Sequence, residues 1–359
     1  MVLWTSPKGY GGSPVVADGC VYLLDLGYLY CVNVSDGQQV WNQSIPSGIP
    51  DSSPAVYKGY VYTPLSAYNA STGEQVLDYP DFQGYTSPIV ADGIIYFGSA
   101  FGSFYALNAT TGSKLWKYLT EETSSPAVAY GRVYFESWDG NIYALDALTG
   151  TKVWNYTLNE PSRYMDSSPA VVDERVFVGG RDGIYCLNAL TGDKIWNHPT
   201  PGASSISSPA VANGYVYLGS IDGNVYALNA SMGTQIWNAT GGGSSSPAVA
   251  GGAVYSGDSV KIVAFNASIG TEIWNYSFPP VEYYMLSSPA IADGVVYAGD
   301  GLSLYAFGTP APTPTPSQQA PLSDLQLIVI AVVAVTLILT SFFLVYKIRR
   351  RGPKNPPPV

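Results

Sequence analysis

The chain has 359 residues and a net charge of −10, and only 12% of its residues are charged. Residues 1–323 hold 11 basic and 25 acidic side chains, because five of the 16 basic residues lie beyond residue 346. Such an acidic surface repels phosphate backbones, which argues against nucleic acid as a partner. The abundance of Gly, Pro and Tyr (38, 27 and 29 residues) is typical of many short strands and turns.

The chain opens with a strand-like segment and continues with a repeated phrase. Residues 1–6 read "MVLWTS", a β-strand pattern with no partner before it, and "SSPAV" or a close variant then recurs eight times. A repeat of 34 to 43 residues with strand-like content predicts the blades of a β-propeller. The phrase prolines are Pro14, Pro54, Pro88, Pro126, Pro169, Pro209, Pro247 and Pro289.

One repeat, residues 207–237, predicts four antiparallel strands: "SPAVA", "YVYLGS", "VYALNA" and "TQIWN", joined by turns at "NG", "DG" and "MG". The last turn ends in Gly in all seven complete copies, and Gly adopts positive φ without steric cost. Four residues later the second copy has Leu77, whereas the others have a Trp that we expect to fill the space between blades. These blade-docking residues are Trp41, Trp116, Trp154, Trp196, Trp237 and Trp274.

The eighth copy ends near residue 308 before any fourth strand. We expect residues 1–6, with Trp4 as the seventh docking residue, to supply that strand and so remove the open sheet edges. The sequence therefore predicts an all-β fold over residues 1–308, an eight-bladed propeller of four-stranded antiparallel blades closed by the N-terminal strand.

The Ser-Pro phrase itself has two interpretations. Proline cannot donate to a sheet ladder, so "SP" is expected to mark the start of each innermost strand. The alternative is that the eight phrases place a ring of serine hydroxyls in the central channel as a ligand site.

Three segments, "LNATTGSKLW" at 107–116, "LDALTGTKVW" at 145–154 and "LNALTGDKIW" at 187–196, resemble the tryptophan-docking repeat of the pyrroloquinoline-quinone-type propellers. The resemblance covers about residues 1–308. The family includes quinone-dependent alcohol and glucose dehydrogenases, and also non-enzymatic scaffolds such as the eight-bladed lipoprotein of bacterial outer-membrane assembly. This chain lacks the adjacent cysteines and the long insertions of the quinone enzymes, so the resemblance implies the non-enzymatic branch, without a cofactor. Pyrroloquinoline quinone bound with calcium is the alternative.

The C-terminal region predicts a membrane anchor. Residues 309–323 form a Pro/Thr-rich stalk, and residues 324–346 include 22 uncharged positions that would span about 33 Å as a transmembrane helix. The basic tail, residues 347–359, is expected in the cytoplasm by the positive-inside rule, which places the propeller outside the cell. Because "MVLWTSP" has no features of a secretory signal, we expect a signal upstream of residue 1.

Nine Asn-x-Ser/Thr acceptors agree with an exterior propeller and predict N-glycosylation, although chance in a Ser/Thr-rich chain is the alternative. Sugars there would crowd the outer rim and one face and leave the other face clean. The acceptors are Asn33, Asn42, Asn69, Asn108, Asn155, Asn229, Asn238, Asn266 and Asn275.

Few residues suggest catalysis. The single histidine, His198, is expected in a surface loop, and the three cysteines form no CxxC motif. Cys20 and Cys31 are expected to be diagonal neighbours in a hairpin, an arrangement that argues against a disulfide. We therefore predict no catalytic, cofactor-binding or metal-binding residues.

The connections at 154–170 and 274–290 are the longest ones into an innermost strand, and both place Tyr-Met just before it. Their exposed side chains are typical of interfaces, so they form the candidate binding face, although aromatic plugging of the channel is the alternative. The residues are Arg163, Tyr164, Met165, Tyr283, Tyr284 and Met285.

These features favour a membrane-anchored extracellular propeller that binds or organises a protein, a glycan or a cell-envelope component. The alternatives are a quinone-dependent oxidoreductase or sugar-binding propeller with its ligand in the channel, and a structural surface-coat protein.

Overall fold

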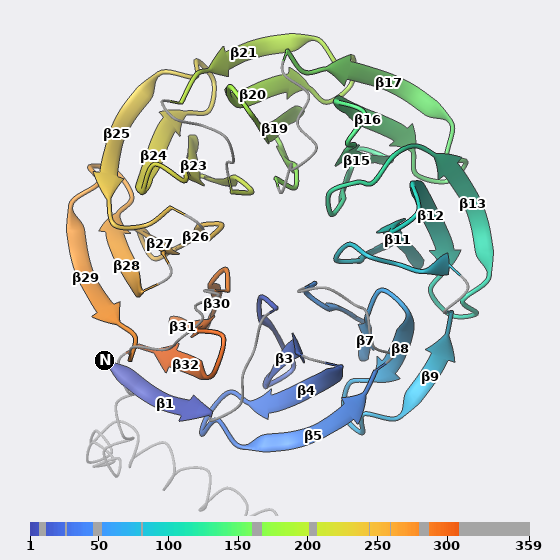
Figure 1. Ribbon diagram of the computed structural model, residues 1–359, viewed down its shortest axis with the longest axis horizontal. Coiled ribbons are helices and arrows are strands. Elements are labelled where there is room, and N and C mark those ends of the chain that lie inside the picture. The colour runs from blue at the N-terminus through green and yellow to red at the C-terminus, as the bar shows by residue number, and fades with distance from the viewer. Residues whose placement is uncertain are drawn as a thin grey trace, which may run out of the picture. The chain divides into compact units, whose positions relative to one another are not determined.

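The computed structural model describes residues 1–6, 12–25, 27–45, 52–79, 82–159, 167–200, 207–243, 245–258, 260–279 and 287–308. Met1–Thr309 form one compact unit. Within these ranges the β-strands make eight sheets, each with four antiparallel strands, as the sequence predicts. Figure 1 shows the eight sheets as the blades of a propeller around a central axis.

Each blade runs from an innermost strand near the axis to an outermost strand at the rim. In this order, blades 1 to 3 consist of β2 (Val15–Ala17), β3 (Cys20–Asp25), β4 (Tyr28–Asn33), β5 (Gln39–Ser44); β6 (Ala55–Tyr57), β7 (Tyr60–Tyr62), β8 (Ser66–Asn69), β9 (Gln75–Asp78); and β10 (Ile89–Ala91), β11 (Ile94–Ser99), β12 (Ser103–Asn108), β13 (Lys114–Leu119). Blades 4 to 6 consist of β14 (Ala127–Ala129), β15 (Arg132–Glu136), β16 (Asn141–Asp146), β17 (Lys152–Thr157); β18 (Ala170–Val172), β19 (Arg175–Gly180), β20 (Gly183–Asn188), β21 (Lys194–His198); and β22 (Ala210–Ala212), β23 (Tyr215–Gly219), β24 (Asn224–Asn229), β25 (Gln235–Thr240). Blades 7 and 8 consist of β26 (Ala248–Ala250), β27 (Ala253–Gly257), β28 (Lys261–Asn266), β29 (Glu272–Ser277); and β30 (Ala290–Ala292), β31 (Val295–Gly299), β32 (Leu304–Phe307), β1 (Val2–Ser6).

The innermost strands close a ring. Contacts run from β2 through β6, β10, β14, β18, β22 and β26 to β30, and β30 contacts β2 again. The fourth strand of each blade lies on the outside of this ring (Figure 1). The repeat period of the sequence therefore corresponds to one blade, and the predicted count of eight is confirmed.

The ring is closed by the N-terminal strand, as predicted. The last sheet has the order β1-β32-β31-β30, and Trp4 lies opposite Ala306 in the register of β1 and β32. The Trp4 ring is 5.8 Å from the ring of Tyr297 on β31. One blade is thus built from both ends of the propeller segment.

The hydrophobic core is divided into layers between blades. In one layer Tyr134, Ile142 and Trp154 of blade 4 pack with Val176 and Tyr185 of blade 5. Side chains of a strand alternate between its two faces, so each blade contributes to the layer on either side. The stability of one blade therefore depends on its neighbours.

The two ends of the strands define two faces of the propeller. The hairpin face carries the Ser-Pro phrases and the hairpins between the second and third strands, such as residues 99–103. The turn face carries the turns between the first and second strands and between the third and fourth strands, such as residues 92–93 and 109–113.

Two details differ from the expectation. The innermost strands begin one residue after the proline, as at Ala210, rather than at "SP", because proline offers no N–H to the ladder. The expectation of a loop at His198 was wrong, since His198 is the last residue of β21 and pairs with Ile184.

The predicted stalk (309–323), transmembrane helix (324–346) and basic tail (347–359) lie outside the described residues. Within the ranges that the structure describes, no helix has the length and apolar character needed to cross a bilayer.

Candidate binding surfaces

Each docking tryptophan attaches its blade to the next one. The Nε1–H of Trp154 in blade 4 donates to the Ala189 carbonyl of blade 5 at 3.0 Å. The indole covers Gly192, where an added Cβ would lie 2.7 Å from the ring. This Gly is therefore required both by its φ of +79° and by the approach of the indole. The same donation joins Trp4 to Val34, Trp41 to Ala70, Trp116 to Ala147, Trp196 to Ala230 and Trp237 to Ala267.

Trp274, the seventh docking residue, packs on Phe307 of blade 8 with ring centroids 5.7 Å apart, as Trp237 packs on Phe265 of blade 7. Blade 8 has no third-to-fourth turn of its own, since its fourth strand comes from the N-terminus. All seven predicted residues thus lie at blade boundaries.

A tyrosine of the second strand shares the same carbonyl acceptor. Tyr134 donates its hydroxyl to the Ala189 carbonyl at 3.1 Å, beside the indole of Trp154. Burial raises the pKa of the equivalent Tyr96 and Tyr217 to about 12, so these hydroxyls remain neutral donors. The shared acceptor could have been suspected from the sequence, because a Tyr recurs in the second strands, as in "VYL".

The Ser-Pro phrase fastens the blades at the hairpin face. Its first hydroxyl ties the innermost strand to the second strand: Ser167 Oγ accepts from the Gly179 N–H at 2.9 Å. Its second residue ties one blade to the next: the Ser168 N–H donates to Ser208 Oγ at 2.8 Å. The first bond recurs in the pairs Thr86–Gly98, Ser124–Glu136, Ser207–Gly219, Ser245–Gly257 and Ser287–Gly299. The second recurs in the pairs Ser53–Ser87, Ser87–Ser125, Ser208–Ser246, Ser246–Ser288 and Ser288–Ser13.

These bonds give the repeated serines a structural role that proline at a strand start does not explain. The second serines are half-buried near the axis, where each hydroxyl that accepts a neighbour's N–H keeps its own proton for a further bond. Six bonds between second serines of neighbouring blades are present among the described residues, so these serines take part in joining the blades.

Five of the nine acceptor asparagines also have a structural role. Asn108 Oδ1 accepts from the N–H groups of Thr110 and Thr111, both at 2.9 Å, and so caps the turn. Asp146 and Asn188 cap the same turn in copies that have no acceptor sequence, and the N–H and hydroxyl of Thr149 lower the pKa of Asp146. The five are Asn33, Asn69, Asn108, Asn229 and Asn266.

The other four acceptors lie on outermost strands. Asn155, Asn238 and Asn275 are exposed there, and Asn42 is half-buried. Each of these asparagines comes directly after a docking tryptophan. Because neighbouring side chains of a strand point to opposite sides, the asparagine points away from the blade boundary that the tryptophan fills.

The predicted binding face, Arg163, Tyr164, Met165, Tyr283, Tyr284 and Met285, lies outside the described residues. The described part of the hairpin face nevertheless exposes large apolar side chains at hairpin tips of several blades. Phe101 is 75% exposed, Ile221 54% and Leu302 53%, and Tyr28 and Val260 also project from hairpins. Apolar side chains repeated at the same place around a ring are a candidate protein-binding surface.

The described residues offer little reactive chemistry. They contain no group of three or more His, Cys, Asp or Glu side chains that could hold a metal ion, so we assign no metal ligand among them.

The three cysteines are not arranged for thiolate chemistry. Cys20 lies opposite Asn33 and Cys31 opposite Tyr22, which is the predicted diagonal arrangement, and the sulfur atoms of Cys20 and Cys31 are 2.6 Å apart. Burial raises the pKa of the Cys31 thiol and raises that of Cys186 to about 12, which disfavours thiolate chemistry.

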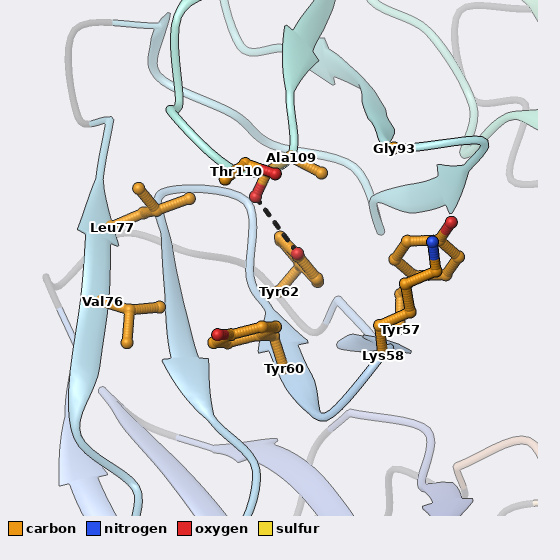
Figure 2. A pocket seen from close by; sticks show the side chains of 9 residues that line it. All are labelled: Tyr57, Lys58, Tyr60, Tyr62, Val76, Leu77, Gly93, Ala109 and Thr110. Carbon is orange, nitrogen blue, oxygen red and sulfur yellow. Dashed lines mark hydrogen bonds between the residues drawn. The ribbon is translucent and has the colours of Figure 1, made fainter.

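A pocket of about 190 Å³ lies between blades 2 and 3 on the turn face (Figure 2). Blade 2 contributes Tyr57, Lys58, Tyr60, Tyr62, Val76 and Leu77, and blade 3 contributes Gly93, Ala109 and Thr110. This is the boundary where Leu77 stands at the position that other complete copies fill with Trp. The sequence showed the exception at residue 77, but not the space that it leaves.

The fold and the docking motif define a tryptophan-docked, eight-bladed propeller. The family described as outer membrane protein assembly factor BamB matches residues 64–208 and 161–309. The chain belongs to this family, which confirms the resemblance seen in the docking segments.

Similar solved structures share the fold. BamB from Moraxella catarrhalis is 17% identical, with 86% of this chain and 99% of that chain covered and a TM-score of 0.72. A quinohemoprotein alcohol dehydrogenase from Comamonas testosteroni is 15% identical, with 88% and 77% covered and a TM-score of 0.69. The serine/threonine-protein kinase AfsK of Streptomyces griseus is 30% identical over 31% of this chain, which spans only 16% of the kinase.

Proposed function

We propose that this protein is a protein-binding scaffold and that its hairpin face carries the binding surface. The observation that carries the proposal is the exposure of Phe101, Ile221 and Leu302 at hairpin tips of three blades. A partner that covers these tips would remove apolar surface from water at several points of one ring. Membership in a family described as a protein assembly factor supports the same function.

We also propose that the chain is anchored in the cell membrane. The uncharged segment within residues 324–346 and the basic tail after it support one membrane helix with a cytoplasmic C-terminus. The propeller would then lie outside the cell, where the nine acceptor asparagines could be glycosylated. Sugars at the five turn asparagines would leave the hairpin face accessible to a partner.

The scaffold proposal is tested by two matched triple variants. Phe101→Ser, Ile221→Ser and Leu302→Ser together remove the apolar tips of the hairpin face. Leu148→Ser, Met232→Ser and Ile269→Ser remove exposed side chains of the turn face and serve as the control. We expect the first variant to recover at least tenfold less of the proteins cross-linked to the wild-type chain in its native membranes, measured by quantitative mass spectrometry.

Equal recovery by both variants would contradict the hairpin face as the binding surface. Self-association of the chain without another protein would favour the surface-coat alternative.

The similarity to quinohemoprotein dehydrogenases keeps an oxidoreductase as the second candidate. It predicts dye-coupled alcohol oxidation when pyrroloquinoline quinone and calcium are added to the purified chain. Such turnover would replace the scaffold proposal.

A further inference from the structure

The pocket between blades 2 and 3 lies where the docking motif is broken. At six other blade boundaries an indole of one blade covers a glycine or turn of the next and donates its N–H to a carbonyl there. At this boundary the equivalent residue is Leu77, which has neither a ring nor a donor. Among the described residues, this boundary therefore has neither the indole nor the indole hydrogen bond that join the six other pairs of blades.

The glycine at this boundary, Gly112, faces the ring of Tyr79 and the side chain of Leu77 instead of an indole. A Cβ added to the corresponding glycines of other blades, such as Gly150 or Gly233, would lie 2.6 Å from an indole. A Cβ added to Gly112 would lie 3.7 Å from Tyr79 and 4.0 Å from Leu77. The surface that an indole covers elsewhere is therefore less closely covered here.

Among the described residues, the carbonyl that receives the indole N–H elsewhere has a tyrosine as its one side-chain donor at this boundary. Tyr62 donates its hydroxyl to the Ala109 carbonyl at 3.2 Å, as the dashed line in Figure 2 shows. At the next boundary the equivalent carbonyl of Ala147 receives both Tyr96 and Trp116, each at 3.0 Å. A carbonyl oxygen has two lone pairs, so Ala109 can accept a second donor from the pocket.

The pocket is large enough for an aromatic ring, and part of its rim is exposed to solvent, where a larger ligand would cover it. Its volume of about 190 Å³ exceeds the roughly 150 Å³ of an engineered apolar cavity that binds benzene. Tyr60 and Val76 line the pocket and are still 39% and 43% exposed. A free indole would leave this rim in water, whereas a polypeptide that presents the ring would cover it.

We propose that the pocket is a docking site for a tryptophan side chain of a partner polypeptide. The indole enters between blades 2 and 3, packs beside Leu77 and Tyr62, and donates its N–H to the Ala109 carbonyl. The partner thereby makes from outside the contact that the chain makes internally at six of its other boundaries. This site is on the turn face, so it is separate from the hairpin surface proposed above.

The probe is a fluorescently labelled pentapeptide with a central Trp, and an otherwise identical peptide with Leu is the comparison. The full chain is produced without N-glycans, because Asn108 lies next to the pocket residue Thr110 and a sugar there could compete. Fluorescence polarisation should show binding of the Trp peptide and at least tenfold weaker binding of the Leu peptide. Equal affinity for the two peptides, or no binding at millimolar chain concentration, would overturn the proposal.

Two variants locate the binding. Leu77→Trp fills the pocket from within and should weaken binding of the Trp peptide at least tenfold. Val76→Arg changes an exposed pocket residue, so it tests the site even if Leu77→Trp does not fold. Its matched control is Ile236→Arg at the same position of blade 6, which should bind like wild type. The assignment would be contradicted if folded Leu77→Trp or Val76→Arg bound the Trp peptide as tightly as wild type. It would also be contradicted if Val76→Arg and Ile236→Arg lost the same amount of affinity.

Discussion

At the scale of single residues, blade 2 shows what the first serine of each phrase does. Ser167 and Ser52 are equivalent and almost fully buried, and Ser167 accepts from the Gly179 N–H. The residue equivalent to Gly179 in blade 2 is Pro64, which has no N–H to donate. Ser52 Oγ accordingly has no hydrogen-bond partner among the described residues. The hydroxyl of Ser167 therefore accepts a hydrogen bond in blade 5, whereas the equivalent hydroxyl of Ser52 in blade 2 has no partner among the described residues.

This pair gives a prediction with an internal control. Ser167→Ala leaves the buried Gly179 N–H without its acceptor, so it should lower the free energy of unfolding by about 1–3 kcal/mol. Ser52→Ala removes a hydroxyl that has no partner and should be neutral or slightly stabilising. Chemical denaturation followed by tryptophan fluorescence measures both. A comparable loss in the two variants would show that the Ser–Gly bond does not stabilise the blade.

At the scale of elements, the outermost strand connects its blade to the next one through a single large side chain. Trp154 is 8% exposed, donates to Ala189 and has its ring 5.9 Å from that of Tyr134. The preceding residue on the same strand, Val153, is 44% exposed. Adjacent positions of one strand thus differ sharply in what they contribute.

Trp154→Ala should lower the free energy of unfolding by about 3–5 kcal/mol, because it leaves a cavity between blades 4 and 5. Val153→Ala should change it by no more than about 0.5 kcal/mol, since its side chain is largely in water. Thermal unfolding of the two variants beside wild type tests this. An unchanged melting temperature for Trp154→Ala would mean that the indole is not part of the blade boundary.

At the scale of the whole propeller, closure depends on two contacts of the N-terminal strand. β1 completes the sheet of blade 8 through β32, and Trp4 donates to the Val34 carbonyl of blade 1 at 2.9 Å. Without β1 the polar backbone of β32 becomes an unpaired sheet edge, which favours pairing with another chain.

Deletion of residues 1–6 should therefore lower the melting temperature and cause self-association, visible as earlier elution in size-exclusion chromatography. Moving the same residues to follow Gly308, through a turn copied from residues 229–234, should restore both properties. If the deletion alone leaves stability and elution unchanged, β1 does not close the ring.

The sequence predicted the blades well, because their signals are local. The turn glycines, the alternation within strands and the Trp four residues after Gly192 each act within a few positions of the chain. The bond from Ser168 to Ser208 was not predicted, since its partners are 40 residues apart and meet only when two blades are side by side. The pocket beside Leu77 was missed for the same reason: residues of two blades form its walls.

The repeat could be predicted from the order of residues alone: how many blades there are, where each strand turns, and which strand is left to close the ring. Periodicity and turn chemistry carry this information without any long-range contact. The folded chain was needed to show which donors bind a carbonyl such as that of Ala109, and that a pocket remains beside Leu77. Those outcomes depend on the packing of one blade against another, and neighbouring side chains determine whether a cavity closes or stays open.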